Sequence, residues 1–188
     1  MKSSPWGHVQ DCTIIAPDIM RVSTASHGGY HCTGNAQERI ETLFPTFTPW
    51  AGRGWYEEDC DWAMVALAHP QHFDDRAVYH ALQTVGNSHA SSDYFTAAQS
   101  WLGNNGEEAR AVRNTAEQYA KTHALEYEIS SLGSAPSSAP RGAWSVSFYR
   151  LIDGATRREV LAEYPRQAVF TEADIDRLAI HTATTEEP

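Results

Sequence analysis

The sequence is short of basic residues. Its 188 residues include 14 Lys and Arg against 24 Asp and Glu, which gives a formal net charge of −10. Between residues 54 and 109, nine acidic residues accompany Arg76 alone, so this stretch carries a net charge of −8. Such a stretch repels a phosphate backbone and attracts basic protein surfaces. The charge pattern therefore predicts a basic protein partner and no direct binding to DNA or RNA.

Long hydrophobic runs are also missing. No window approaches the roughly eighteen uninterrupted apolar residues of a membrane-spanning helix, and the first residues lack the apolar segment of a signal peptide. The three cysteines, Cys12, Cys32 and Cys60, are an odd number without a C-x-x-C pair. They favour reduced thiols over a disulfide framework. We therefore expect a cytoplasmic protein that does not enter a membrane.

Familiar catalytic and cofactor motifs are absent from the sequence. It contains no G-x-S-x-G nucleophile elbow, no phosphate-binding glycine loop and no dinucleotide fingerprint. A complete four-ligand zinc set is not visible either. We therefore expect no cofactor, and no metal requirement for folding.

Core-forming residues are plentiful, with 41% hydrophobic residues and six Trp. A chain of this length and composition can bury a sizeable core as one domain. Residues 9–15 and 19–24 have strand character around the turn residues 16–18, which predicts a hairpin. Residues 30–33 add a short third strand. Near the C-terminus, residues 144–149 alternate apolar and polar side chains, and Asp153-Gly154 predicts a second hairpin that ends near residue 164.

Helical patterns fill the middle of the chain. Apolar spacing, caps and breakers predict helices over residues 35–43, 56–69, 74–85, 93–102 and 107–125. Thr171 and Asp174 resemble a capping box that opens a short last helix, and the Ser/Ala/Pro/Gly-rich residues 130–142 predict an exposed flexible loop. Together the elements predict a single α+β domain over residues 1–188. In it the two hairpins share one antiparallel sheet and four to five helices pack on one face.

The acidic segment over residues 54–62, GWYEEDCDW, is the most unusual in the chain. Acids in a first helical turn complement the positive end of the helix dipole, which is one interpretation. The other is an acidic site in which Glu57 and Asp61 lie one helical turn apart and hold a metal or a basic partner. The candidate partner-binding residues of the middle of the chain are Glu57, Glu58, Asp61, Asp74 and Asp75.

A second conspicuous segment is SHGGYHC, over residues 26–32. Paired glycines form tight turns or allow close backbone approach, and His27 stands before them in a position where a loop presents it. A simple glycine-rich connection between strands explains the same residues. His27, His31 and Cys32 are candidate metal ligands, although their spacing matches neither a zinc finger nor an H-E-x-x-H helix.

Several of these segments resemble a known domain family. The resemblance is carried by residues 5–7 (PWG), 15–17 (IAP), 22–29 (VSTASHGG), 54–63 (GWYEEDCDWA) and 65–67 (VAL). They are similar to an uncharacterised family found on proteobacterial plasmids, phages and integrated elements. The resemblance supplies no catalytic residues. It implies a mobile-element setting, in which accessory roles such as counter-defence against restriction or CRISPR systems are to be expected by analogy.

Two functional hypotheses follow. The first is a non-enzymatic interaction module, of the anti-CRISPR or anti-restriction type, whose acidic region occupies a basic surface of a host protein. The second is a small hydrolase-like or metal-binding enzyme in which His27 and the acidic cluster from Glu57 to Asp61 converge on one cleft. A histidine and carboxylates form a minimal general acid–base set, which makes His27, Glu57 and Glu58 the candidate catalytic residues.

Overall fold

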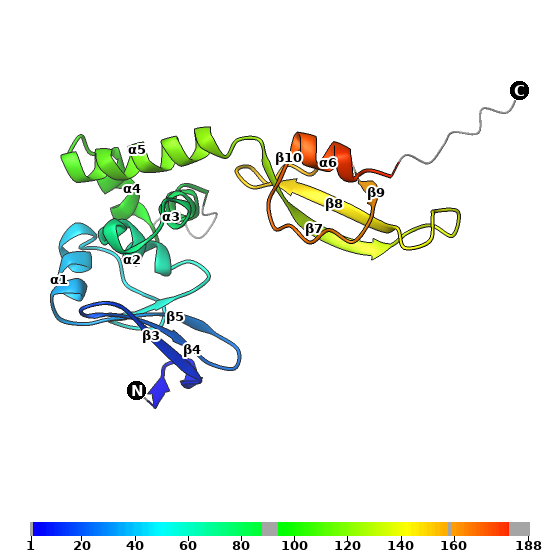
Figure 1. Cartoon of the computed structure of the whole chain (residues 1–188). Coiled ribbons are helices and arrows are strands. Elements are labelled where there is room, and N and C mark those ends of the chain that lie inside the picture. The colour runs from blue at the N-terminus through cyan, green and yellow to red at the C-terminus, as the bar shows by residue number, and fades with distance from the viewer. Residues whose placement is uncertain (1, 88–93, 158, 181–188) are drawn as a thin grey trace, which may run out of the picture. The chain divides into compact units, whose positions relative to one another are not determined.

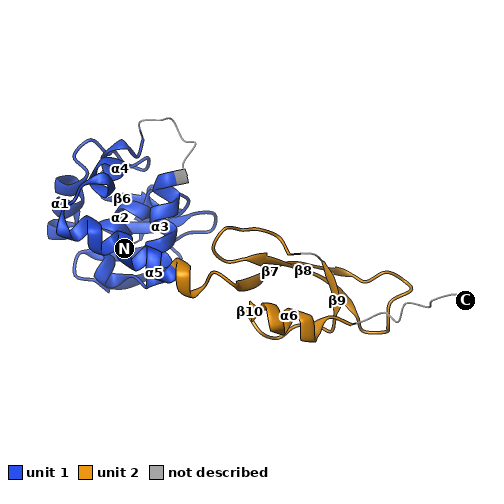
Figure 2. Ribbon diagram, turned by 90° about the horizontal axis from the view of Figure 1, so that it is seen from above, with its two compact units in different colours: residues 1–119 blue, residues 120–188 orange. Residues whose placement is uncertain are grey.

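The chain folds into two compact units. A computed structural model describes residues 2–87, 94–157 and 159–180. Unit 1 comprises Met1–Tyr119 and unit 2 comprises Ala120–Pro188, as coloured in Figure 2. Each unit combines helices with an antiparallel sheet, so the predicted α+β class is confirmed. Each unit is described by itself below.

The sheet of unit 1 begins with the predicted N-terminal hairpin. Its four strands lie in the order β3 (Asp11–Ala16), β4 (Ile19–Ser23), β5 (Gly28–Cys32) and β6 (Trp55–Glu57), and all neighbours are antiparallel. A separate two-stranded ribbon pairs β1 (Ser3–Ser4) with β2 (Gly7–His8). Asp18 takes a positive φ of 65° at the turn between β3 and β4. Its carbonyl accepts a 2.9 Å hydrogen bond from the amide of Thr33, which ties the hairpin to the end of β5.

The helices of unit 1 are stacked above this sheet in Figure 1, and the one that forms the centre of the core packs directly against the strands. They are α1 (Gly34–Leu43), α2 (Trp62–Ala68), a 3-10 helix η1 (Pro70–His72), α3 (Asp75–Asn87), α4 (Thr96–Gly103) and α5 (Glu107–Thr122). Residues 63–68 of α2 are all buried, because a helix that is apolar on every side can only be stable when surrounded. None of the described helices is long and apolar enough to cross a membrane.

One predicted helix is wrong in its first half. The helical spacing of Tyr56, Cys60, Ala63 and Leu67 predicted a helix over residues 56–69, but residues 55–57 form strand β6 and the helix begins only at Trp62. Tyr56 lies opposite Tyr30 in the register with β5. Pairing with a strand already in place outweighs a weak helical pattern. The acidic residues 57–61 therefore connect a strand to a helix.

The remaining central helices agree better with their predictions. Helix α1 begins within one residue of its predicted start, although Thr33 rather than Asn35 is its N-cap residue. Helices α3 and α5 match the predicted spans closely. Helix α4 begins at Thr96, and the start that was predicted for it, Asp93, lies outside the described residues.

Unit 2 has its own sheet and its own core. The strands lie in the order β10 (Phe170–Thr171), β7 (Glu126–Ser134), β8 (Trp144–Arg150) and β9 (Val160–Ala162). Helix α6 (Glu172–Leu178) starts at the predicted capping box, in which Thr171 and Asp174 exchange side-chain and backbone hydrogen bonds. Its buried Ile175 packs with residues of the sheet, including Phe148 and Phe170.

Two predictions about the C-terminal part are wrong. The N-terminal and C-terminal hairpins do not share a sheet, because β6 completes the first sheet and β10 completes the second. The flexible loop predicted over residues 130–142 is also too long at its start. Residues 130–134 continue β7, where Leu132 pairs with Val146 and Ser134 with Trp144. Residues 131–134 pair with β8 through backbone hydrogen bonds. The Ser- and Gly-rich composition of this segment gave no sign of that pairing.

Candidate functional site

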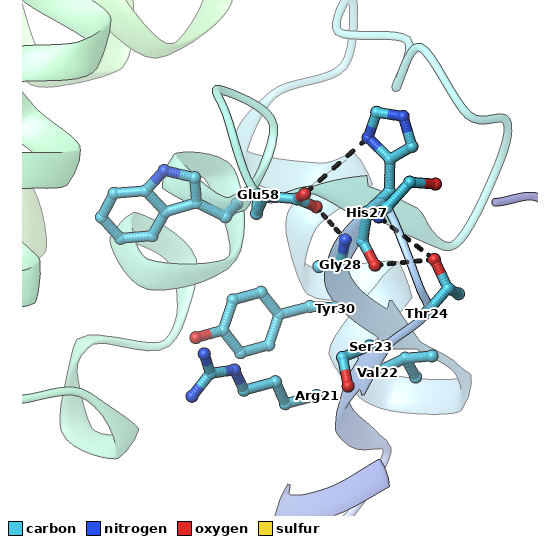
Figure 3. Close-up of a pocket in the computed structure, with 11 residues that line it drawn as sticks. Arg21, Val22, Ser23, Thr24, His27, Gly28, Tyr30 and Glu58 are labelled. Atoms are coloured by element: carbon cyan, nitrogen blue, oxygen red, sulfur yellow. Dashed lines mark hydrogen bonds and ion pairs between the residues drawn. The ribbon is translucent and has the colours of Figure 1, made fainter. Parts of the chain in front are cut away.

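A pocket of about 460 Å³ opens in unit 1 beside the paired glycines (Figure 3). Its walls come from the ends of β4 and β5, from the turn between them and from the residues that follow β6. The residues that line it are Arg21, Val22, Ser23, Thr24, Ser26, His27, Gly28, Gly29, Tyr30, Glu58 and Trp62. The two conspicuous segments of the sequence therefore meet at one place.

The turn between β4 and β5 fixes the backbone of His27. The amide of Thr24 donates to the carbonyl of His27 at 2.7 Å, and the Thr24 hydroxyl donates to the same carbonyl at 2.9 Å. The His27 amide donates to the Thr24 hydroxyl oxygen at 3.1 Å. Such side-chain bonds to local backbone are how threonine stabilises tight turns. They present the exposed imidazole at the edge of the pocket.

The glycines let the acidic segment approach this turn. Gly29 faces Glu57 in the β5–β6 register, and a Cβ atom on Gly29 would lie only 2.1 Å from the Tyr56 carbonyl oxygen. The amide of Glu58 donates to the Gly28 carbonyl at 3.1 Å, while the Gly28 amide donates to the Glu58 carboxylate. Glycine is needed here for close backbone approach, and this approach brings both glutamates to His27.

His27, Glu57 and Glu58 form a compact ligand cluster. The Nδ1 atom of His27 lies 3.6 Å from Oε1 of Glu57 and 3.8 Å from Oε1 of Glu58, and one ligand atom from each residue lies within 4.8 Å of the others. These separations are too long for hydrogen bonds. Ligand atoms at about 2.1 Å from a tetrahedral cation lie about 3.4 Å apart, so the spacing suits ligands placed around an ion.

Backbone amides hold the second oxygen of each glutamate. Oε2 of Glu57 accepts a hydrogen bond from the Asp59 amide at 2.9 Å, and Oε2 of Glu58 accepts from the Gly28 amide. Supporting contacts of this kind orient ligands in metal sites. Each Oε1 atom is thereby directed toward His27, as Figure 3 shows for Glu58.

The side chain of Glu57 is almost completely buried, which is unusual for a glutamate. The residue is 7% exposed, and burial raises the pKa of its carboxyl group, although the Asp59 amide and the charge of His27 act in the opposite direction. A buried carboxylate is stabilised when a cation lies beside it. The cluster therefore has the charge as well as the spacing of a cation site.

The part of the chain that contains this cluster matches a family model. The match is to a Domain of unknown function (DUF7007) and covers residues 1–122. The chain belongs to this family. No curated protein and no solved structure matches it. The DUF7007 domain coincides closely with unit 1, which ends at Tyr119, and it contains the whole pocket.

Asp61 of the DUF7007 domain does not belong to the cluster. It is 0% exposed, and its carboxylate accepts hydrogen bonds from the Trp50 amide at 2.8 Å and from the Tyr94 hydroxyl. Burial raises the pKa of Asp61, while these hydrogen bonds act to lower it. The assignment of Asp61 to a partner-binding surface is therefore wrong, because no partner can reach the carboxylate.

The predicted partner-binding residues Asp74 and Asp75 are exposed and lie at the start of helix α3. Asp74 accepts a 2.7 Å hydrogen bond from the Ala77 amide at the start of α3, and Asp75 is the acidic residue in the first turn of that helix. The neighbour of Asp74, Phe73, packs edge-on against Tyr30 at 5.5 Å between ring centroids. Asp74 thus stands close to the pocket, near enough for its charge to act on Tyr30.

The predicted metal ligands His31 and Cys32 are not brought to His27. The His31 ring lies 4.1 Å from the ring of Trp55. Cys32 lies on the face of β5 opposite to His31, since successive residues of a strand alternate between faces. It is buried, and burial raises the pKa of its thiol to about 12. Among the described residues, only His27 retains a place in a ligand cluster, with Glu57 and Glu58 as its companions.

Sequence reasoning did not single out Arg21, Tyr30 or Trp62 as pocket residues. A signal for Arg21 and Tyr30 was present in the second and third predicted strands of the chain. Once β4 pairs with β5, Arg21 lies opposite Tyr30, and both side chains must then point to the same face of the sheet. Trp62 carried no such signal because its position depends on where α2 begins.

Proposed function

We propose that the DUF7007 domain of this chain binds a divalent metal ion through His27, Glu57 and Glu58 and holds a small ligand in the adjoining pocket. The observation that carries the proposal is the convergence of three ligand atoms within 4.8 Å of one another. Their separations from Nδ1 of His27, 3.6 and 3.8 Å, exceed hydrogen-bond length. The proposal develops the second hypothesis drawn from the sequence, with His27, Glu57 and Glu58 as its residues and without Asp61.

The ligand set suggests which ions to test and which chemistry to expect. Imidazole nitrogen suits zinc and its neighbours in the first transition row, and carboxylate oxygen suits magnesium and manganese. Three protein ligands leave positions open for water and substrate, as in catalytic metal sites. A zinc ion so bound would lower the pKa of its water to about 7, so the proposed activity is metal-assisted hydrolysis of a ligand that occupies the pocket.

A cation titration tests the proposal. Isothermal titration of the purified chain with Mn²⁺ and with Zn²⁺ should give one site per chain. His27→Ala should weaken the metal affinity about 100-fold. Loss of a residue that only supports a metal ligand costs about 10- to 100-fold, and His27 is proposed as a ligand itself. His8→Ala is the matched control, because His8 is an exposed histidine of β2. Equal affinities for the His27→Ala and wild-type chains would reject the proposal.

A second candidate function is binding of a basic protein surface, and one observation favours it. Glu58 lines the pocket, and Asp74 lies close enough to the pocket residue Tyr30 to influence it. Two exposed acids from separate elements thus stand beside the same aromatic pocket. In this proposal the chain is a counter-defence inhibitor from a mobile genetic element, of the anti-CRISPR or anti-restriction type, as the sequence resemblance implies.

Charge reversal tests this second candidate. Glu58→Lys combined with Asp74→Lys should reduce retention on an immobilised basic protein, such as a host nuclease, at least tenfold at low salt, since charged rims act mainly on association. Retention of the wild-type chain should also fall as salt screens the attraction. Reversal of the exposed Glu107 and Glu163 is the matched control. Equal losses in both double variants would point to net charge alone and contradict a specific surface.

A further inference from the structure

The pocket has a cationic end as well as an acidic one. Arg21 of β4 and Tyr30 of β5 face each other across the two strands, and both line the pocket that His27 and Glu58 border. Figure 3 shows the guanidinium of Arg21 beside the hydroxyl end of Tyr30, on the side of the pocket away from His27. A ligand in the pocket therefore has a positive group on one side and the proposed metal on the other.

Arg21 is not engaged elsewhere in the part of the chain that the structure describes. Of the 14 basic residues against 24 acidic ones, many form ion pairs, as Arg53 does with Glu41 and Arg157 with Glu172. The side chain of Arg21 has no hydrogen bond or ion pair with any described residue, and its only described electrostatic partner is Tyr30. Its five N–H donors are available to a ligand.

Tyr30 adds a second donor at the same end. Its side chain is partly buried against Phe73, and burial raises the pKa of the phenol, with the charge of Arg21 acting in the opposite direction. The hydroxyl thus stays protonated at neutral pH and can donate a hydrogen bond. A guanidinium fork beside a hydroxyl donor fits the oxygens of a phosphate or a carboxylate, which arginine binds in a bidentate manner.

We infer that Arg21 and Tyr30 form an oxyanion subsite, so that the ligand of this pocket is a small molecule with a phosphate or carboxylate group. The inference rests on the proposed function, because the metal held by His27, Glu57 and Glu58 would contact the reacting part of the same ligand. A pocket of about 460 Å³ has the size of small-molecule sites. The acids Glu58 and Asp74 beside it repel long polyanions, which excludes nucleic acid as the ligand.

Thermodynamic coupling between the two ends provides the test. An anion at Arg21 and a cation at His27, Glu57 and Glu58 attract each other across the pocket, so the anion must tighten metal binding and the metal must tighten anion binding by the same factor. Mn²⁺ affinity is therefore measured by titration without added anion, with inorganic phosphate and with acetate. One of the two anions should raise the Mn²⁺ affinity of the wild-type chain about tenfold. The anion with the larger effect identifies phosphate or carboxylate as the preferred group.

The variants separate this inference from the proposed function. Arg21→Gln should leave Mn²⁺ affinity without anion unchanged and abolish the tenfold enhancement, whereas Arg141→Gln, a change of an exposed arginine in unit 2, should keep the enhancement. If Mn²⁺ binds but neither anion enhances it, or if Arg21→Gln keeps the enhancement, the oxyanion subsite is rejected and the metal site stands.

If Mn²⁺ does not bind, the proposed function fails. Phosphate or acetate binding is then followed directly by NMR, and binding that Arg21→Gln leaves unchanged rejects the subsite as well.

Discussion

Replacing Gly29 by alanine is expected to destabilise unit 1 by about 4 kcal/mol or more, in the range of the most damaging single substitutions. A Cβ atom at this position would lie 2.1 Å from the carbonyl oxygen of Tyr56 and 2.7 Å from the Trp6 ring. Relief of the first contact requires β5 and β6 to separate, because the atom that is struck belongs to the backbone. Gly29 also has a φ of 151°, which side-chain-bearing residues rarely adopt.

Urea unfolding followed by tryptophan fluorescence measures this effect. Five of the six tryptophans lie in unit 1, so the signal reports mainly on that unit. Gly86→Ala is the matched control, because Gly86 lies in helix α3 and a Cβ atom there meets nothing within 4 Å. The control should be stabilised by about 0.5 to 1 kcal/mol. An unfolding midpoint for Gly29→Ala equal to that of the wild type would contradict the close approach on which the site depends.

Asp61→Ala is expected to lower the free energy of unfolding by about 3 to 5 kcal/mol, the usual loss when a buried polar network is broken. The change leaves the Trp50 amide and the Tyr94 hydroxyl without their shared acceptor. Asp75→Ala is the control, since Asp75 is an exposed aspartate at the start of α3, and it should change stability by less than about 0.5 kcal/mol. Similar urea midpoints for both variants would show that Asp61 is dispensable.

The stability of unit 1 should also depend on pH through Asp61. Burial raises the pKa of Asp61 in the folded state above its unfolded value of about 4. The favourable contribution is therefore fully present below the unfolded pKa and is lost as the pH rises through the folded pKa. Asp61→Asn removes this titration, so the stability of the variant should fall less than that of the wild type between pH 4 and neutrality. Parallel pH profiles for the two chains would contradict the assignment.

The elements that the sequence predicted correctly are those set by neighbouring residues. The turn at Asp18 fixes the N-terminal hairpin, and the Thr171 capping box fixes the start of α6. Strand β6 was missed because it has only three residues and exists through its pairing with β5. Its aromatic residues fit a strand, but the helical spacing of Tyr56 with Cys60 continued into α2 and concealed the boundary.

The same boundary decided which site residues were predicted correctly. The sequence suggested that His27 meets the acidic segment, and the structure brings it to Glu57 and Glu58. A continuous helix placed Glu57 and Asp61 on one face. With a strand up to Glu57 and a helix from Trp62, Asp61 is buried in the interior, and Glu57 and Glu58 alone of this segment lie beside the histidine. Which of the acidic side chains meet His27 depends on the path of the chain between strand β6 and helix α2. The residue types alone do not predict this path.

The division into two cores has a consequence for how the chain is made. Every buried residue of the larger core lies between Ala16 and Val112, and the smaller core draws only on residues from Tyr127 onward. During synthesis from the N-terminus, all buried residues of the first core have therefore been translated before any strand of the second. Domains commonly fold in this order, at about 5 to 20 residues per second of elongation. At this rate, roughly one to three seconds separate Val112 from the first residue of β7, Glu126, and in that time the DUF7007 domain can begin to close around helix α2 without competition from the C-terminal strands.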